Sequence, residues 1–177
     1  MFNIEPLDAE RWRGHVLDFS YRSESYYDVC IDKNASSFIV SFTKKPFEKT
    51  YENRDSDKLS KPWWEDVKAW GIVDGDDLSA VIETAVEKWN NRLRVTILWV
   101  AEKLKRQGVG TALMNLAKQR AHEEKRRAII LETQTCNEAA LAFYFSQGFK
   151  LIGFDACCYA NNDIDRKEVR MELGFFL

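Results

Sequence analysis

Residues 93–121 constrain the fold more than any other stretch of this sequence. Apolar and polar side chains alternate from Leu93 to Trp99, which is typical of a half-buried strand. From Val109 onward, apolar residues recur at the spacing of one helical face, ending near Ala121. A strand that passes through a short turn into an amphipathic helix predicts an α/β fold.

The turn between that strand and that helix is basic and contains two glycines, Gly108 and Gly110. The start of a helix leaves N–H groups without intrahelical partners and carries positive partial charge. Glycines allow a ligand to approach the backbone closely, and Lys103, Lys105 and Arg106 add formal charge. The turn therefore predicts a phosphate site, or alternatively only a tight connection. The common dinucleotide and Walker-type patterns are both incomplete here.

Composition limits the function classes. The chain has 177 residues, of which 45% are hydrophobic and 31% charged, with a net charge of −2. This predicts one globular domain and gives no basic field that would favour nucleic acid or a membrane as partner. We expect a cytoplasmic protein, because neither a signal-like segment nor a membrane-length apolar run is present. The four cysteines lack metal-ligand spacing, so we predict buried small side chains and no metal.

The expected elements follow from periodicity and turn signals. In the first part, Asp8 caps a predicted helix with Trp12, Val16 and Phe19 on one face. The remaining predictions there are strands at 2–6 and 38–46, a mixed segment at 20–36 and a polar loop at 48–61. Further along we predict strands at 67–73, 78–88, 93–100, 128–131, 151–159 and 169–176, with helices at 109–124 and 138–147.

Two motifs give the chain a family resemblance. The first is Lys105-Arg-Gln-Gly108-Val-Gly110, and the second is Asn137-x-x-Ala140-x-x-Phe143-Tyr144-x-x-x-Gly148-Phe149. In this order the motifs resemble those of the GCN5-related N-acetyltransferase (GNAT) family, which binds acetyl-coenzyme A. The order of predicted elements also matches the mixed, mostly antiparallel α/β sheet of that family. The resemblance implies one N-acetyltransferase domain over 1–177, with a substrate-side segment at 1–66 and a coenzyme-binding core at 67–177.

The resemblance also implies roles for individual residues. Backbone amides of the turn would hold the coenzyme pyrophosphate, and Asn137 would contact the pantetheine arm. Tyr144 would donate a proton or a hydrogen bond to the leaving thiolate, although it could also serve only in packing. The predicted coenzyme-binding residues are Leu98, Trp99, Val100, Lys105, Arg106, Gln107, Gly108, Val109, Gly110, Thr111, Asn137, Ala140 and Tyr144.

The general base is less evident. Many family members carry a glutamate on the strand before the turn, where this chain has Thr96 and Ile97. Glu132 and Glu83, on neighbouring predicted strands, are substitutes, but each fits a structural or substrate-orienting carboxylate better. A water relay is therefore our preferred proton path.

One branch of the family, the streptothricin acetyltransferases, is more similar still. The segments that match are Leu131-Glu-Thr-Gln134, Gly153-x-Asp155-x-x-x-Tyr159 and Pro46-x-x-Lys49-x-Tyr51. This implies a cationic amine acceptor, whose other ammonium groups would be held by Asp155, Glu132 and Glu83. Open alternatives are a polyamine, peptide or protein amine as acceptor, or a sensor that binds the coenzyme without chemistry. A homodimer also stays open.

Overall fold

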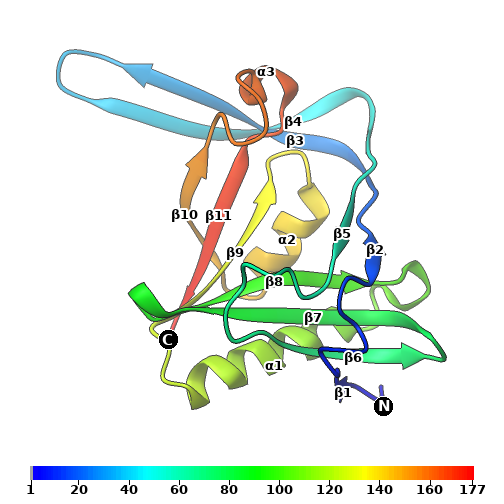
Figure 1. Cartoon of the computed structure of the whole chain (residues 1–177). Coiled ribbons are helices and arrows are strands. Elements are labelled where there is room, and N and C mark those ends of the chain that lie inside the picture. Colours follow the sequence, from blue (N-terminus) through cyan, green and yellow to red (C-terminus); the bar gives the residue numbers. More distant parts are fainter. Residues whose placement is uncertain (1) are drawn as a thin grey trace. The chain divides into compact units, whose positions relative to one another are not determined.

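The computed structural model describes residues 2–177, which form two compact units (Figure 1). Unit 1 contains the described residues up to Phe19, together with Asp55–Leu131 and Gly174–Leu177. Unit 2 contains Ser20–Arg54 and Glu132–Leu173. The chain therefore passes between the units several times, and β9 (Ala128–Gln134) and β11 (Arg170–Phe176) have residues in both.

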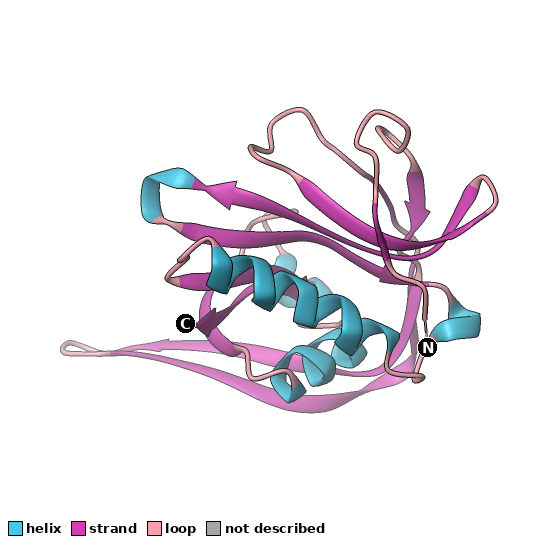
Figure 2. Cartoon of the chain, turned by 90° about the horizontal axis from the view of Figure 1, so that it is seen from below, coloured by secondary structure: helices cyan, strands magenta, loops and turns pink. Residues whose placement is uncertain are grey.

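Unit 1 is built on a sheet in the order β1-β6-β7-β8-β9. Its strands are β1 (Glu5–Pro6), β6 (Lys68–Asp74), β7 (Asp77–Glu87), β8 (Arg92–Val100) and the first part of β9. Neighbouring strands are antiparallel except β8 and β9, which run parallel. The helix α1 (Val109–Glu123) packs against β6, β7 and β8 (Figure 2). Two short 3₁₀ helices, η1 (Lys88–Asn90) and η2 (Glu102–Leu104), flank β8.

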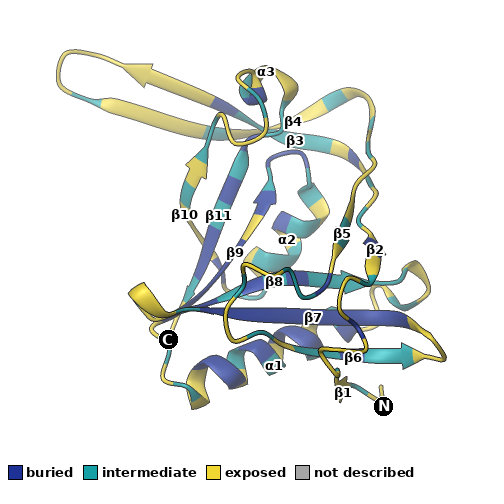
Figure 3. Cartoon of the chain, viewed as in Figure 1, coloured by how far each residue is buried: buried dark blue, intermediate teal, exposed yellow. Residues whose placement is uncertain are grey.

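The strand β7 lies at the centre of this unit. Its nine residues from 78 to 86 are all buried (Figure 3). Fully buried side chains of α1, among them Leu113 and Ala117, supply apolar cover. A separate core cluster joins Leu78 and Val81 of β7 to Trp12, Leu17, Leu59 and Ile97. The predicted meander from 67 to 100 and the helix after the turn are thus confirmed.

The helix predicted after Asp8 is wrong. The Asp8 carboxylate does accept hydrogen bonds from the amides of Glu10 and Arg11, at 2.8 and 2.9 Å, as a helix cap would. The chain then makes only turns and reaches Gly14 with a φ of +74°. It continues as β2 (Val16–Asp18), which pairs with β5 (Ser56–Lys58). Of the predicted apolar face, Trp12 enters the core from a turn and Phe19 packs against it, but Val16 is 55% exposed and its neighbour Leu17 is buried instead.

Unit 2 contains a long antiparallel hairpin and a small helix-bearing sheet. The hairpin is β3 (Tyr21–Lys33) and β4 (Phe38–Asn53). The second part of β9, the first part of β11 and β10 (Lys150–Asp155) follow in the order β9-β11-β10. The helix α2 (Glu138–Ser146) packs against β3, and α3 (Asp163–Arg166) precedes β11.

Several predictions for unit 2, and one for β5 of unit 1, need correction. The strand predicted at 38–46 continues to Asn53, so the loop predicted at 48–61 is wrong for its first part and again at β5. The strand predicted at 151–159 ends at Asp155, whose carboxylate accepts the Cys157 amide at 3.0 Å and so favours a turn. Of the cysteines, Cys136 is buried, whereas Cys30, Cys157 and Cys158 are exposed. The three exposed cysteines lie on the β3–β4 hairpin and in the turn after β10, outside any core, so the prediction of buried cysteines is wrong for them.

Most of the remaining elements lie where they were predicted. The segment at 20–36, for which no element was predicted, contains the strand β3, the strand predicted at 2–6 covers only Glu5–Pro6, and α3 was not predicted. α2 ends before Gly148, which adopts a φ of +87° that favours glycine. The fold class, a mixed α/β arrangement with a mostly antiparallel sheet, is confirmed. Within residues 2–177, no helix is both long enough and apolar enough to cross a membrane.

Candidate functional site

The two-glycine turn connects β8 to α1 in unit 1. The amide of Ala101 donates to the Ser79 carbonyl at 2.9 Å, and η2 then redirects the chain. Gly108 has a φ of +86°, and a side chain there would meet no atom within 4 Å. The first intrahelical hydrogen bond of α1 runs from the Ala112 amide to the Gly108 carbonyl at 3.0 Å. The amides of 109–111 thus form the start of the helix, where an anion is favoured.

The basic residues of the turn differ in their partners. Lys103 pairs with Asp74 and Lys105 pairs with Glu102, both at 2.7 Å. The Gln107 side chain donates to the Lys103 carbonyl at 2.7 Å, which closes the turn. Arg106 is exposed and has a φ of +59°. The positive character of the turn therefore comes mainly from the helix start and Arg106, because both lysines already face carboxylates.

The strand β8 pairs differently along its two edges. It pairs with β7 as far as Val100, but its parallel register with β9 in unit 1 covers only residues 92–94. Leu98, Trp99 and Val100, predicted to bind coenzyme, lie beyond that point. The Trp99 indole donates to the Asp18 carbonyl at 2.7 Å, so its side chain is held within unit 1. The backbone edge of 95–100 is the part of β8 that a ligand with amide groups could extend.

A buried carboxylate lies at an irregularity between β7 and β8. Glu83 pairs with Ile97 and Thr84 with Val95, so Thr96 is an extra residue, a β-bulge. The Thr96 hydroxyl donates to Glu83 at 2.7 Å, and the Ser60 amide donates at 2.6 Å. Glu83 is fully buried, and this burial raises its pKa against the opposing effect of those donors. Its carboxylate therefore faces these two donors, and direct contact between Glu83 and a substrate stays a prediction.

The second motif forms α2 in unit 2. The Asn137 side chain caps the helix by accepting the Ala140 amide at 3.2 Å. Tyr144 lies in the middle of α2, with its ring centroid 5.5 Å from Phe143 and 6.1 Å from Phe149. Burial raises the pKa of Tyr144 to about 12. The phenol therefore keeps its proton at neutral pH and can act as a donor.

Two of the predicted substrate carboxylates meet at one arginine of unit 2. Arg170 approaches Glu132 at 3.5 Å and Asp155 at 3.9 Å. The pKa of Asp155 is lowered, first by the Cys157 amide and further by Arg170. These carboxylates already share a cation, so a second cation would bind to a partly neutralised pair.

An aromatic and acidic cluster in unit 2 was not predicted from the sequence. The Tyr21 hydroxyl lies 3.1 Å from the Cys136 sulfur, and the Tyr51 hydroxyl donates to the Glu168 carboxylate. The two tyrosine rings lie 6.3 Å apart. Cys136 immediately precedes the α2 cap, so this cluster fixes the start of the helix that carries Tyr144. The grouped tyrosines at 21, 26 and 27 were the only local signal.

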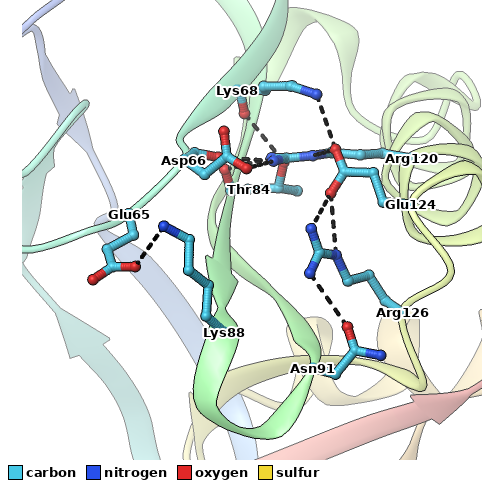
Figure 4. Close-up of polar contacts among 9 residues, drawn as sticks. All are labelled: Glu65, Asp66, Lys68, Thr84, Lys88, Asn91, Arg120, Glu124 and Arg126. Carbon is cyan, nitrogen blue, oxygen red and sulfur yellow. Dashed lines mark hydrogen bonds and ion pairs between the residues drawn. The ribbon is translucent and has the colours of Figure 1, made fainter.

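A buried arginine anchors the end of α1 that is far from the turn (Figure 4). Arg120 donates to the Thr84 carbonyl and hydroxyl at 3.0 and 2.8 Å, and to the Asp66 carbonyl at 2.8 Å. It also donates to Glu124 at 2.8 Å, and Glu124 receives Lys68 and Arg126 as well. Because Thr84 directly follows the bulge, this network ties the helix to the strand beside Glu83. In the sequence, the only sign of this network is that Arg120 is a charged residue on the apolar face of the predicted helix at 109–124.

Metal binding has no evident site. Among residues 2–177, no three His, Cys, Asp or Glu side chains are grouped so as to hold a metal ion.

Comparisons with known proteins show the family and the fold of this chain. The model of the acetyltransferase (GNAT) family matches residues 29–149. The streptothricin acetyltransferase of Streptomyces lavendulae is 27% identical over 162 residues, which is 89% of this chain and 84% of that protein. The crystal structure of nourseothricin acetyltransferase has a TM-score of 0.74 and 24% identity, covering 98% of each chain. An acetyltransferase from Bacillus anthracis str. Ames, in complex with acetyl coenzyme A, has a TM-score of 0.73 and 24% identity, covering 98% of this chain and 96% of the other. These two structures have the same fold as this chain.

Proposed function

Because this chain belongs to the acetyltransferase (GNAT) family, we propose that it transfers acetyl from acetyl-coenzyme A to a primary amine of a streptothricin-type antibiotic. One observation carries the first part of this proposal. The glycine turn opens α1 soon after β8, whose parallel register with the unit 1 part of β9 covers residues 92–94. Similarity to a streptothricin acetyltransferase along 89% of the chain supports the acceptor class.

In this proposal the turn binds the charged part of the coenzyme. The amides of Gln107, Gly108, Val109, Gly110 and Thr111 receive the pyrophosphate, and Arg106 adds charge. The pantetheine arm extends the β8 edge at Leu98, Trp99 and Val100. Lys105 contributes less than its charge suggests, because Glu102 pairs with it at 2.7 Å. Asn137 and Ala140, at the start of α2, also contact the pantetheine arm.

The reaction requires two proton movements. The acceptor nitrogen attacks the thioester carbonyl carbon, the carbon–sulfur bond breaks, and the nitrogen loses one proton while the thiolate gains one. An alkyl ammonium has a pKa of about 10.4, so presenting it neutral at pH 7 costs about 4.6 kcal/mol. Tyr144 supplies the thiolate proton, and its raised pKa of about 12 keeps it protonated beforehand.

The amine proton leaves through water in this proposal. Glu83 orders the bulge at Thr96 rather than contacting the acceptor, because its carboxylate is fully buried and bonded to Ser60 and Thr96. Glu132 and Asp155 hold the acceptor's other ammonium groups. Arg170, which lies between the two carboxylates, weakens this attraction. Acetylation would remove one positive charge from the drug and weaken its attraction to an anionic target, which is the basis of resistance.

The test is release of free thiol from acetyl-coenzyme A by the purified protein with three acceptors. Streptothricin should support turnover, whereas spermidine and a peptide amine should give much less. Turnover with the peptide or the polyamine alone would overturn the drug acceptor and leave the family activity in place. Expression in a sensitive bacterium should also raise its resistance to streptothricin.

The role of Tyr144 is tested by Tyr144→Phe, which removes only the hydroxyl. We expect the transfer rate to fall by about 10²–10⁴-fold while the affinity for acetyl-coenzyme A, measured by calorimetry, stays within about twofold. Tyr27→Phe, which removes a hydroxyl from β3, is the matched control and should change neither quantity. An unchanged rate in Tyr144→Phe would reduce this residue to a packing role.

A further inference from the structure

The outer half of the β3–β4 hairpin has one apolar face. We call residues 29–42 the arm, which extends as a long ribbon in Figure 1. Val29 pairs with Phe42, Ile31 with Val40, and Lys33 with Phe38. Directly opposed residues of antiparallel strands share a face, as do alternate residues of one strand. Five apolar side chains of the arm thus form a single stripe, consisting of Val29, Ile31, Phe38, Val40 and Phe42.

The side chains of this stripe become more exposed toward the tip of the hairpin. Val29 is 7% exposed, and the Phe42 ring meets Phe154 of β10 edge-on at 5.4 Å. Beyond that contact Ile31, Val40 and Phe38 are 44%, 38% and 73% exposed (Figure 3). The opposite face of the arm is mostly polar, with Cys30, Asp32 and Ser41, and Ile39 is its one large apolar residue.

The stripe continues onto an edge strand of the same unit. β10 is the last strand in the order β9-β11-β10, and Ile152 and Phe154, which share one of its faces, are 38% and 37% exposed. Phe154 is the residue that contacts Phe42, so the two apolar surfaces adjoin. Edge strands with exposed apolar side chains are surfaces on which another chain can pair, and contiguous apolar patches mark interaction sites.

We propose that this surface, the arm stripe together with β10, binds the same surface of a second copy of this chain. A surface that is mainly apolar can pack against a second copy of itself, and a two-fold axis makes such contacts in pairs. The net charge of −2 gives little repulsion between copies. An anionic lipid surface fits less well, because the stripe carries only Lys33 and Lys44 at its ends, and Lys44 is paired with Glu138.

The area is sufficient for a specific dimer. Five exposed apolar side chains lie on this surface, namely Ile31, Phe38, Val40, Ile152 and Phe154. At roughly 200 Å² for each large side chain, their exposed fractions amount to about 450 Å² of apolar area per copy. Two copies with their polar rims would then bury roughly 1,200 Å² or more, the lower end of stable interfaces. Covering the arm would also stabilise a two-stranded ribbon that is only marginally stable alone.

The test is sedimentation velocity of the full chain between about 1 and 100 µM. We expect a dimer whose dissociation constant rises at least 100-fold in Phe38→Glu/Val40→Glu, because a charge in the interface must be desolvated. Ile39→Glu places the same charge one residue away on the opposite face, so it should change the dissociation constant by less than about threefold. Circular dichroism would verify that each variant is folded.

Three results would overturn the proposal. The first is a monomeric wild type at 100 µM. The second is a dimer that persists in the double variant, or that Ile39→Glu weakens to the same extent. The third is a monomer that sediments with phosphatidylcholine vesicles or with vesicles containing phosphatidylserine, and loses this binding in the double variant, which would assign the stripe to a lipid surface.

Discussion

The meander β6-β7-β8 of unit 1 and the hairpin β3–β4 of unit 2 are both antiparallel, yet they are buried to very different extents. β7 has nine consecutive buried residues, whereas β4, at 16 residues, has none. Backbone pairing is continuous over most of each. Pairing satisfies the backbone but adds little net stability by itself, whereas buried apolar area adds roughly 25 cal/mol per Å². Strand length is therefore a poor guide to where the stability of this chain resides.

The largest expected effect is on the anchor between α1 and β7. Arg120→Met keeps the length of the side chain but removes four hydrogen bonds to Thr84, Asp66 and Glu124. Since it leaves the buried acceptors of Thr84 without their cation, we expect the free energy of unfolding, measured by urea titration, to fall by about 3–5 kcal/mol. Gln119→Met, the exposed neighbour on the same helix, is the control and should stay within about 0.5 kcal/mol. Equal losses of stability in the two variants would mean that the buried contacts of unit 1 stabilise the fold no more than exposed positions do.

An intermediate effect is expected at Glu124, and it depends on pH. Burial alone would raise the pKa of Glu124, but hydrogen bonds from Lys68, Arg120 and Arg126 bring it down to about 2. A lowered carboxylate pKa stabilises the fold above the ordinary value of 4.5, and this contribution is lost as pH falls toward 2. Glu124→Gln should therefore cost about 1.5–3 kcal/mol at pH 7. The difference from wild type should shrink as the pH is lowered, as followed by denaturant titration at each pH.

The smallest expected effect is at the tip of the hairpin. Ile39 is 57% exposed on the polar face of the arm, so Ile39→Thr removes little buried area and should change the unfolding free energy by less than about 0.5 kcal/mol. Thermal unfolding at matched protein concentration is the measurement. A loss of 2 kcal/mol or more would mean that the arm is covered on both faces and that the contrast between the regions is false.

The same contrast explains which elements could be predicted from the sequence. Strands of the meander show apolar alternation because their side chains enter a core, and their turns carry residues such as Gly75 and Asn91 with positive φ. The segment from 48 to 53 shows no such alternation, because its half-exposed strand takes polar residues as readily as a loop does. The false helix after Asp8 shows that helical spacing can also arise from a turn followed by a strand.

For the candidate site, the sequence predicted the features that depend on residues close to one another in the chain. The turn at Gly108 and the helix that starts at Glu138 are of this kind. Long-range pairs were missed, because no periodicity predicts that Arg170 lies between Glu132 and Asp155. Arg120 was missed for the same reason, since its partners at Thr84 and Asp66 lie 36 and 54 residues away.

The division of β9 and β11 between the units bears on the order of folding. Unit 1 includes Gly174–Leu177, and the Leu177 amide reaches the Arg127 carbonyl at 3.3 Å. Neither unit can thus be completed on the ribosome before the last part of this sequence has been made, at about 5–20 residues per second. Contacts between residues this far apart slow folding through the cost of loop closure. Rapid refolding with a single phase on the millisecond scale would therefore be unexpected for this topology.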